Sequence, residues 1–239
     1  MTLGHLARTF FWPLGIDVHK FQPSKSPVAL RRQLFQTFQI DTVLDVGANV
    51  SQFAEELRKD IHYTGRICSF EPLSSAYSIL EARARKDPRW QTFNFALGNA
   101  EEKKSIHIAN NSQSSSLLAM LPAHVRSAPD SRYIAEETIS VRKLDSIYPE
   151  LCSQSRNVLL KIDTQGYESF VLEGAAHSLP LIHTLQLELS NVPLYDGQLL
   201  FHELYSMLAK TGYALVAIEP AFAAPTGEIL QLDGIFHKY

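Results

Sequence analysis

Ionisable side chains stand at the ends of several short apolar runs in this 239-residue sequence. Asp45 lies near the end of one run, and Glu71 follows the next run 26 residues further along the chain. Asp163 and Glu188 end two runs in the second half, and Lys161 comes two residues before Asp163. Carboxylates in such places can accept a proton from a reacting hydroxyl or hydrogen bonds from a polar ligand.

We expect the catalytic residues to be Asp163, Glu188 and Lys161, with Asp163 orienting or deprotonating an acceptor hydroxyl and Glu188 assisting. In a regular strand Lys161 points to the same side as Asp163, and pairing would keep both groups ionised. Each residue also has a structural alternative. Asp163 could cap a loop, Glu188 could form an ion pair or cap a helix, and Lys161 could neutralise another carboxylate.

Other ionisable residues give weaker signals. The nine histidines are dispersed without an HExxH pattern and the acidic residues form no tight cluster, so we predict no metal site. His124 and His202 are the histidines best placed to act as a general base, although no spacing singles them out. Glu168 falls in the first turn of a predicted helix, where a carboxylate is favourable without any catalytic role.

A glycine turn follows the first apolar run and indicates a ligand site. Gly47 lets the backbone approach a ligand closely, and the helix after it offers unpaired N–H groups. Glu71 can accept hydrogen bonds from both ribose hydroxyls of an adenosine. A dinucleotide-binding turn has three glycines, whereas Gly47-Ala48-Asn49-Val50-Ser51-Gln52 has one. Asp45, placed inside the turn, would repel a pyrophosphate and suits a sulfonium.

The turn therefore favours S-adenosylmethionine over NAD, with a sheet that binds no cofactor as the remaining alternative. The residues expected to bind the cofactor are Asp45, Gly47, Ala48, Asn49, Ser51, Glu71, Pro72, Ala96 and Leu97.

The elements that position these residues alternate along the chain. Strands are predicted at 42–46, 66–70, 91–97, 158–162, 183–189, 213–219 and 229–237. Helices are predicted at 27–38, 51–59, 74–86, 167–172 and 199–210. Alternating strands and helices require right-handed crossovers and a parallel sheet. The last two strands have no helix between them and should therefore pair antiparallel. The predicted fold class is α/β, a Rossmann-like methyltransferase fold. It has a mostly parallel seven-stranded sheet with an antiparallel last strand and helices on both faces.

The domain organisation is predicted as an N-terminal segment and helix, residues 1–39, packed on a domain formed by residues 40–239. Residues of about 99–156 interrupt the rhythm and are interpreted as an insertion over the sheet. An apolar stretch, Phe10-Phe11-Trp12-Pro13-Leu14, is too short to span a bilayer. We interpret it as packed on the domain, with a membrane-surface or substrate-docking role as the alternative.

The composition is that of an ordinary globular protein, with 45% hydrophobic and 20% charged residues. A net charge of −3 without a Lys/Arg cluster argues against a nucleic-acid partner. Cys68 and Cys152 are predicted to be reduced thiols in a cytoplasmic protein without integral membrane association.

Several short motifs occur together between about residue 40 and the end of the chain. They are Asp45-Val46-Gly47-Ala48-Asn49, Phe70-Glu71-Pro72, Ala96-Leu97-Gly98, Ser114-Ser115-Ser116-Leu117, Leu160-Lys161-Ile162-Asp163-Thr164-Gln165-Gly166-Tyr167-Glu168, Leu187-Glu188-Leu189-Ser190, Pro193-Leu194-Tyr195-Asp196-Gly197-Gln198 and Gln231-Leu232-Asp233-Gly234-Ile235-Phe236. In this combination the sequence resembles the FkbM-type methyltransferase family. One departure is Ser51, where that family usually has glycine; a serine there could cap the following helix.

The resemblance implies methyl transfer from S-adenosylmethionine, usually to an oxygen of a sugar or natural product. The predicted function is therefore O-methylation of a hydroxyl on a saccharide, glycolipid or natural product, with a small-molecule or glycan acceptor as the partner. The alternatives are a small-molecule N-methyltransferase and a methyltransferase-like domain that binds its ligand without catalysis.

Overall fold

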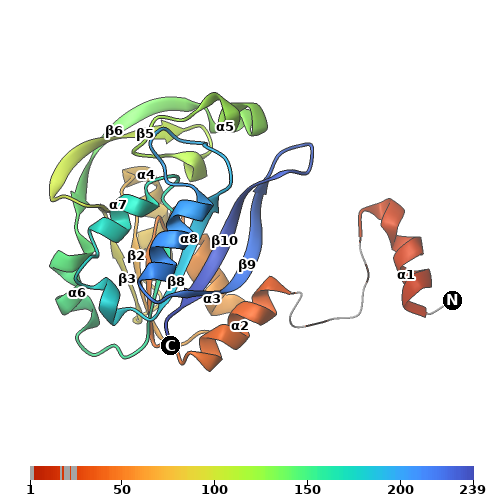
Figure 1. Ribbon diagram of the computed structural model, residues 1–239, viewed down its shortest axis with the longest axis horizontal. Coiled ribbons are helices and arrows are strands. Elements are labelled where there is room, and N and C mark those ends of the chain that lie inside the picture. Colours follow the sequence, from red (N-terminus) through yellow and green to blue (C-terminus); the bar gives the residue numbers. More distant parts are fainter. Residues whose placement is uncertain (1–2, 17, 19–21, 23–25) are drawn as a thin grey trace. The chain divides into compact units, whose positions relative to one another are not determined.

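The computed structural model describes residues 3–16, 18, 22 and 26–239. The chain divides into two compact units, Met1–Thr37 and Phe38–Tyr239. The described part of the first unit contains helix α1 (Leu3–Phe11), the 3-10 turn η1 (Trp12–Leu14) and helix α2 (Pro27–Thr37). The second unit contains the central sheet and every predicted catalytic and cofactor residue (Figure 1).

Seven strands form the central sheet in the order β3-β2-β1-β7-β8-β10-β9 (Figure 1). Their bounds are β1 Thr42–Val46, β2 Arg66–Phe70, β3 Trp90–Phe93, β7 Val158–Ile162, β8 Thr184–Ser190, β9 Ala214–Ala223 and β10 Ile229–His237. The pairs among β3, β2, β1, β7 and β8 are parallel, and β10 is antiparallel to both β8 and β9. The predicted seven-stranded, mostly parallel sheet is confirmed.

Helices cover both faces of this sheet, with α6, α7 and α8 in front and α3 and α4 behind in Figure 1. Their bounds are α3 Gln52–Lys59, α4 Ser74–Ala84, α6 Leu144–Cys152, α7 Glu168–Glu173 and α8 Phe201–Lys210, with a 3-10 turn η5 at Leu179–Leu181. Every residue of β1 and β7 is buried, as expected for parallel strands covered on both faces. Helix α6 was not predicted, although Leu144, Ile147 and Leu151 pack into the main core at helical spacing.

A second, three-stranded sheet has the order β4-β6-β5. Its elements are β4 Ala96–Leu97, β5 Glu102–Ala109 and β6 Tyr133–Arg142, joined through η3 Ser112–Ser114, α5 Pro122–Ser127 and η4 Pro129–Ser131. The prediction of one strand over 91–97 is wrong, because β3 ends at Phe93 and β4 pairs with β6. Between them the Asn94 amide donates hydrogen bonds to the carbonyls of Glu71 and Pro72, where the chain leaves the central sheet.

Both cysteines are free thiols in the core, as predicted. Burial raises the pKa of Cys68 to about 11 and that of Cys152 to about 12. In the portion of the chain that the structure describes, every helix is too short or too polar to cross a bilayer.

Candidate active site

Four predicted residues lie level with one another at the carboxyl edge of the central sheet. Val46 is in register with Phe70 of β2 and Ile162 of β7, and Ile162 is in register with Leu187 of β8. The residues that come next are Gly47 after β1, Glu71 after β2, Asp163 after β7 and Glu188 within β8. Parallel pairing thus brings the cofactor turn and both predicted catalytic carboxylates to one edge, where ligands of open α/β sheets bind.

The glycine turn after β1 packs directly on Asp163. Gly47 has φ +76, and a Cβ atom there would lie 1.8 Å from the Asp163 carbonyl oxygen. The N–H groups of Gly47 and Ala48 both donate to the Phe70 carbonyl, at 3.1 and 3.0 Å. Glycine is therefore required here by the neighbouring strand end as well as by any ligand that approaches the turn.

Lys161 is an enclosed cation between two carboxylates. Its Nζ lies 3.3 Å from Asp45 Oδ1 and 3.3 Å from Asp163 Oδ2. Burial by itself would lower the pKa of Lys161, but the charges of Asp163 and Asp45 outweigh it and raise that pKa above its usual value. The predicted pairing of Lys161 with Asp163 is confirmed.

Asp45 occupies a different place from the one predicted. It lies inside β1 and is wholly buried, whereas the sequence interpretation placed it in the turn facing the ligand. Its Oδ2 accepts a hydrogen bond from Ser69 at 3.1 Å, and its other oxygen faces Lys161. The β1–β7 register explains the difference, because it puts Asp45 opposite Lys161. The Asp45 carboxylate therefore pairs with the Lys161 ammonium and holds that side chain in place.

Glu71 is buried at the end of β2 and is held by two backbone groups. Its Oε2 accepts from the N–H of Asn49 at 2.8 Å, and its Oε1 accepts from the N–H of Leu73 at 2.9 Å. Burial raises the pKa of Glu71 to about 7, against the opposing effect of these two bonds. A carboxylate oxygen has a second lone pair, so each oxygen can accept one more hydrogen bond. This arrangement fits a vicinal diol such as the ribose of the predicted cofactor.

Asp163 and Glu188 are joined through one amide that sequence analysis missed. Gln165 Nε2 donates to Glu188 Oε2 at 2.7 Å and to Asp163 Oδ1 at 3.1 Å. A second amide, Gln231 of β10, donates to the same Glu188 oxygen at 2.7 Å. Burial, followed by the charges of Asp163 and Glu168, raises the pKa of Glu188 well above its usual value. The two carboxylates therefore form one hydrogen-bonded cluster.

A serine-rich loop from the second sheet closes over this cluster. Ser116 donates to the Gln165 carbonyl at 2.7 Å, and Ser112 donates to Asn49 Oδ1 at 3.1 Å. Tyr195 donates to Gln165 Oε1 at 2.7 Å and to the Ser114 carbonyl at 3.3 Å. The loop thus contacts both the cofactor turn and the turn after Asp163. The Ser-rich motif was the only sequence signal for these contacts, and it did not identify their partners.

The remaining candidate bases are placed as follows. The ring of His124 is buried against Tyr195, 5.1 Å between centroids, and its Nδ1 has no hydrogen-bond partner among the residues that the structure describes. Burial lowers the pKa of His124, so this ring is neutral at pH 7. His202 is exposed on α8. Glu168 Oε1 accepts from Thr164 N, Thr164 Oγ1 and Gly166 N at 2.9, 3.1 and 3.2 Å, which makes it a turn-capping carboxylate.

Ser51 adopts an unusual backbone conformation. It has φ 94 at the position before α3, and its side chain makes no capping hydrogen bond to that helix. The prediction of a serine cap is therefore wrong, because a residue in this left-handed conformation does not have the extended backbone of a capping serine. Instead the buried hydroxyl accepts a hydrogen bond from Arg83 at 3.0 Å.

Replacing Ser51 with glycine should leave cofactor affinity equal or improve it, and should raise the free energy of unfolding by up to about 1 kcal/mol. Glycine adopts a positive φ without the Cβ penalty that serine incurs. Calorimetric titration and thermal denaturation measure the two effects. The matched variant Ser51→Ala keeps the Cβ and loses the hydroxyl that bonds Arg83 and Glu55. A loss of affinity beyond about tenfold in Ser51→Gly would show that the hydroxyl has a necessary contact.

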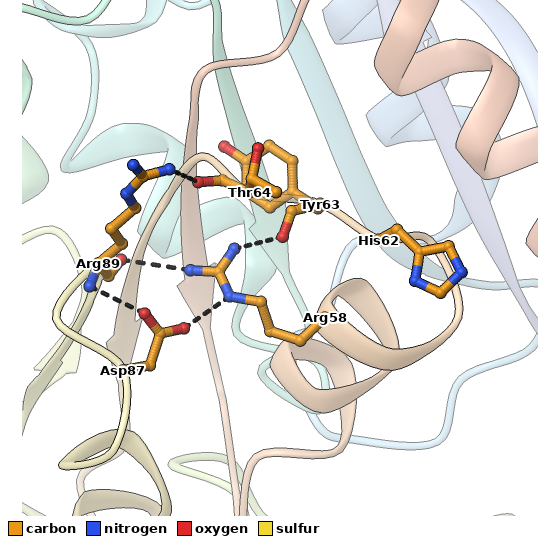
Figure 2. A pocket seen from close by; sticks show the side chains of 6 residues that line it. All are labelled: Arg58, His62, Tyr63, Thr64, Asp87 and Arg89. Carbon is orange, nitrogen blue, oxygen red and sulfur yellow. Dashed lines mark hydrogen bonds and ion pairs between the residues drawn. The ribbon is translucent and has the colours of Figure 1, made fainter.

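A separate hollow of about 390 Å³ lies between the end of α3 and the loops that precede β2 and β3 (Figure 2). It is lined by Arg58, His62, Tyr63, Thr64, Asp87 and Arg89. Figure 2 shows the Arg58 guanidinium between the Asp87 carboxylate and the Tyr63 carbonyl, each 2.7 Å away. None of the predicted site residues lines this hollow, and it is at the amino ends of the strands. The described residues also contain no group of three His, Cys, Asp or Glu side chains arranged to hold a metal.

The family assignment follows from comparison with known proteins. The profile of the FkbM methyltransferase domain matches residues 45–215, from the strand that holds Asp45 to the strand that starts at Ala214. The chain belongs to the FkbM methyltransferase family. The resemblance read from the motifs is thus confirmed. The protein is a methyltransferase of Rossmann-like fold, and its cofactor is S-adenosylmethionine.

Similar solved structures are distant in sequence. A Streptococcus pneumoniae protein described as a tRNA methyltransferase, solved with S-adenosyl-L-methionine, has 12% identity and a TM-score of 0.48, with 87% of this chain and 72% of that chain covered. The magnesium protoporphyrin IX methyltransferase of Synechocystis has 8% identity and a TM-score of 0.46, with 100% and 98% covered. The search of curated proteins found no match. Similarity this low carries no information about the methyl acceptor.

Proposed function

We propose that this FkbM-family protein transfers a methyl group from S-adenosylmethionine to a hydroxyl oxygen of a saccharide, glycolipid or natural product. The observation that supports this most directly is the pair Asp163 and Glu188, joined by Gln165 at the strand ends, next to the glycine turn. An alcohol loses its proton when its oxygen is methylated, so the site needs a group that can accept that proton. A neutral amine already has a nucleophilic lone pair and loses its proton only after it has accepted the methyl group.

The residues around the turn fit the cofactor. We propose that Glu71 accepts the two ribose hydroxyls with its remaining lone pairs, and that Gly47, Ala48, Asn49 and Pro72 line the same edge. Asp45 and Ser51 are buried and bonded to Lys161 and Arg83, so their proposed contribution is to hold the turn in place. Ala96 and Leu97 are as buried as Ala48 and Glu71, and they stay proposed cofactor contacts.

The proton is accepted by Asp163 in this proposal. The bound cofactor supplies an electrophilic methyl group. The Asp163 side chain keeps 37% of its surface exposed, so it can reach an acceptor hydroxyl, whereas the Lys161 side chain keeps 8%. Lys161 Nζ lies 3.3 Å from Asp163 Oδ2 and fixes the orientation of this carboxylate, which can then orient the hydroxyl or accept its proton. Glu188 is held in place by Gln165 and Gln231 and assists by orienting the acceptor.

A transfer assay with methyl-labelled S-adenosylmethionine tests the proposed function. The acceptors are nucleotide sugars, glycolipids and polyketide glycosides, with a set of small amines as the comparison. We expect label in a product whose mass spectrum shows a methyl ether on a former hydroxyl. Label found only on nitrogen would contradict O-methylation. Cofactor binding without transfer to any acceptor would favour a binding domain instead.

A further inference from the structure

The first unit of the chain exposes large apolar side chains close together. Phe10, Trp12, Leu14 and Ile16 are 72%, 61%, 68% and 50% exposed, and they fall within seven consecutive residues of α1, η1 and the turn after it. We call these four residues the N-terminal apolar patch. Exposed apolar residues scattered singly need no explanation, whereas a contiguous group of this kind marks a surface that contacts another phase or partner.

A cation lies beside this patch, in a segment with more basic than acidic residues. Residues 1–37 contain five Lys and Arg residues and one Asp, whereas the whole chain has a net charge of −3. Of the five, Arg31 is buried in α2. Arg8 of α1 is exposed, and its guanidinium lies 5.4 Å from the centre of the Trp12 ring. The cation therefore stands beside the apolar patch. An apolar surface with an exposed cation beside it complements the surface of an anionic bilayer, where one Lys or Arg contributes about 1 kcal/mol.

The polar residues of α1 are also those of an interfacial helix. His5, Arg8 and Thr9 are exposed, and Thr9 Oγ1 donates back to the His5 carbonyl at 2.9 Å, so this hydroxyl is satisfied within the helix. The nine residues of α1 are too few to cross a bilayer, but an interfacial helix needs no such length. Helices of this type lie in the plane of the interface with Trp, Phe and Leu at the boundary between headgroups and acyl chains.

We propose that residues 3–16 form an interfacial anchor that binds anionic phospholipid surfaces. The N-terminal apolar patch enters the boundary between headgroups and acyl chains, and Arg8 contacts the lipid phosphates. This binding is independent of the methyl-transfer reaction and of the acceptor.

Flotation of the full-length protein with vesicles tests this anchor. One set of vesicles is phosphatidylcholine, and the other is phosphatidylcholine mixed with phosphatidylglycerol. We expect binding to the second set that weakens as salt is raised, because exposed charges are screened. The double variant Phe10→Ser/Trp12→Ser should bind at least about tenfold more weakly, which corresponds to about 1.4 kcal/mol. The matched controls Ile134→Ser and Leu181→Ser remove apolar residues that are 64% and 58% exposed elsewhere, and they should bind as the unmodified protein does.

Tryptophan fluorescence gives a second measurement. Trp12 is exposed, whereas Trp90 is buried with its indole N–H bonded to Ser69 at 3.0 Å. Binding should shift the Trp12 emission to shorter wavelength, and Trp12→Phe should remove that shift. The proposal is overturned if neither vesicle set binds, or if the double variant floats as well as the unmodified protein. It is also overturned if the patch instead joins two copies, seen as a dimer that the double variant dissociates.

Discussion

Replacing Glu71 with alanine should weaken S-adenosylmethionine binding by at least about 10²-fold, because it removes two hydrogen bonds to a charged group at about 1.5–3 kcal/mol each. Both Glu71 oxygens are already fixed by the N–H groups of Asn49 and Leu73, so the carboxylate is oriented before the ligand arrives. Isothermal titration calorimetry measures the affinity. Unchanged affinity in Glu71→Ala would contradict the proposal that Glu71 binds the ribose hydroxyls of the cofactor.

Two further variants serve as comparisons. Glu71→Gln keeps one carbonyl oxygen as an acceptor and loses the charge, but its NH2 group meets the N–H of Asn49 or Leu73. It should bind more weakly and also unfold at a lower temperature, and the temperature shift measures damage to the turn. Glu81→Ala removes a Glu from α4 that makes only a surface ion pair with Arg85, and it should bind normally.

The same residue predicts how affinity varies with pH. Burial raises the pKa of Glu71 to about 7, so the carboxyl is largely protonated below that pH and ionised above it. The ionised form accepts both ribose hydroxyls, and affinity should therefore rise as pH increases through about 7. Glu71→Gln should flatten this rise. Glu168→Gln should retain it, since burial also raises the pKa of Glu168 to about 7 but all three of its bonds use one oxygen that glutamine keeps.

Replacing Asp163 with asparagine should reduce turnover at saturating substrates by at least about 10²-fold, the usual contribution of general-base assistance. Cofactor affinity should stay within a few-fold. The amide keeps the shape of the side chain, and its oxygen can still accept the hydrogen bond from Gln165. It cannot accept the proton, and it leaves Lys161 paired with Asp45 alone. Labelled-methyl turnover and calorimetric binding, measured on the same preparation, check both statements.

Asp196→Asn is the matched control for this variant, because Asp196 is an exposed carboxylate in the same region and should give normal turnover. Collapse of cofactor binding with unchanged turnover at saturation would make Asp163 a cofactor residue. If neither quantity changes, Asp163 is structural, and His124 beside Tyr195 becomes the next base to test. Activity that a chelator removes and Mg²⁺ restores would contradict a metal-free reaction.

The sequence by itself determined which runs form the parallel strands and at which end of those strands the candidate site residues lie. The runs at 42–46, 66–70 and 158–162 are the observed strands β1, β2 and β7, because parallel strands buried on both faces must be continuously apolar. The helices between these strands make them parallel, because a crossover through a helix returns the chain in the same direction. Residues at the carboxyl ends of those strands, Glu71 and Asp163, had to meet at one edge whatever the details of packing.

Only the tertiary structure decided which groups these residues contact. Gln231 reaches Glu188 from an antiparallel strand 43 positions later, and Ser112 reaches Asn49 from the second sheet 63 positions away. Three other features could not be predicted from the sequence either. They are the ion pair of Asp45 with Lys161, the hydrogen bonds of Gln165 that join Asp163 to Glu188, and the left-handed backbone of Ser51. Local patterns report which face of an element is buried, whereas hydrogen-bond partners depend on strand register and on how a distant loop docks. The sequence therefore predicted which strand ends carry the candidate site, and the packing of separate segments determined which groups its residues contact.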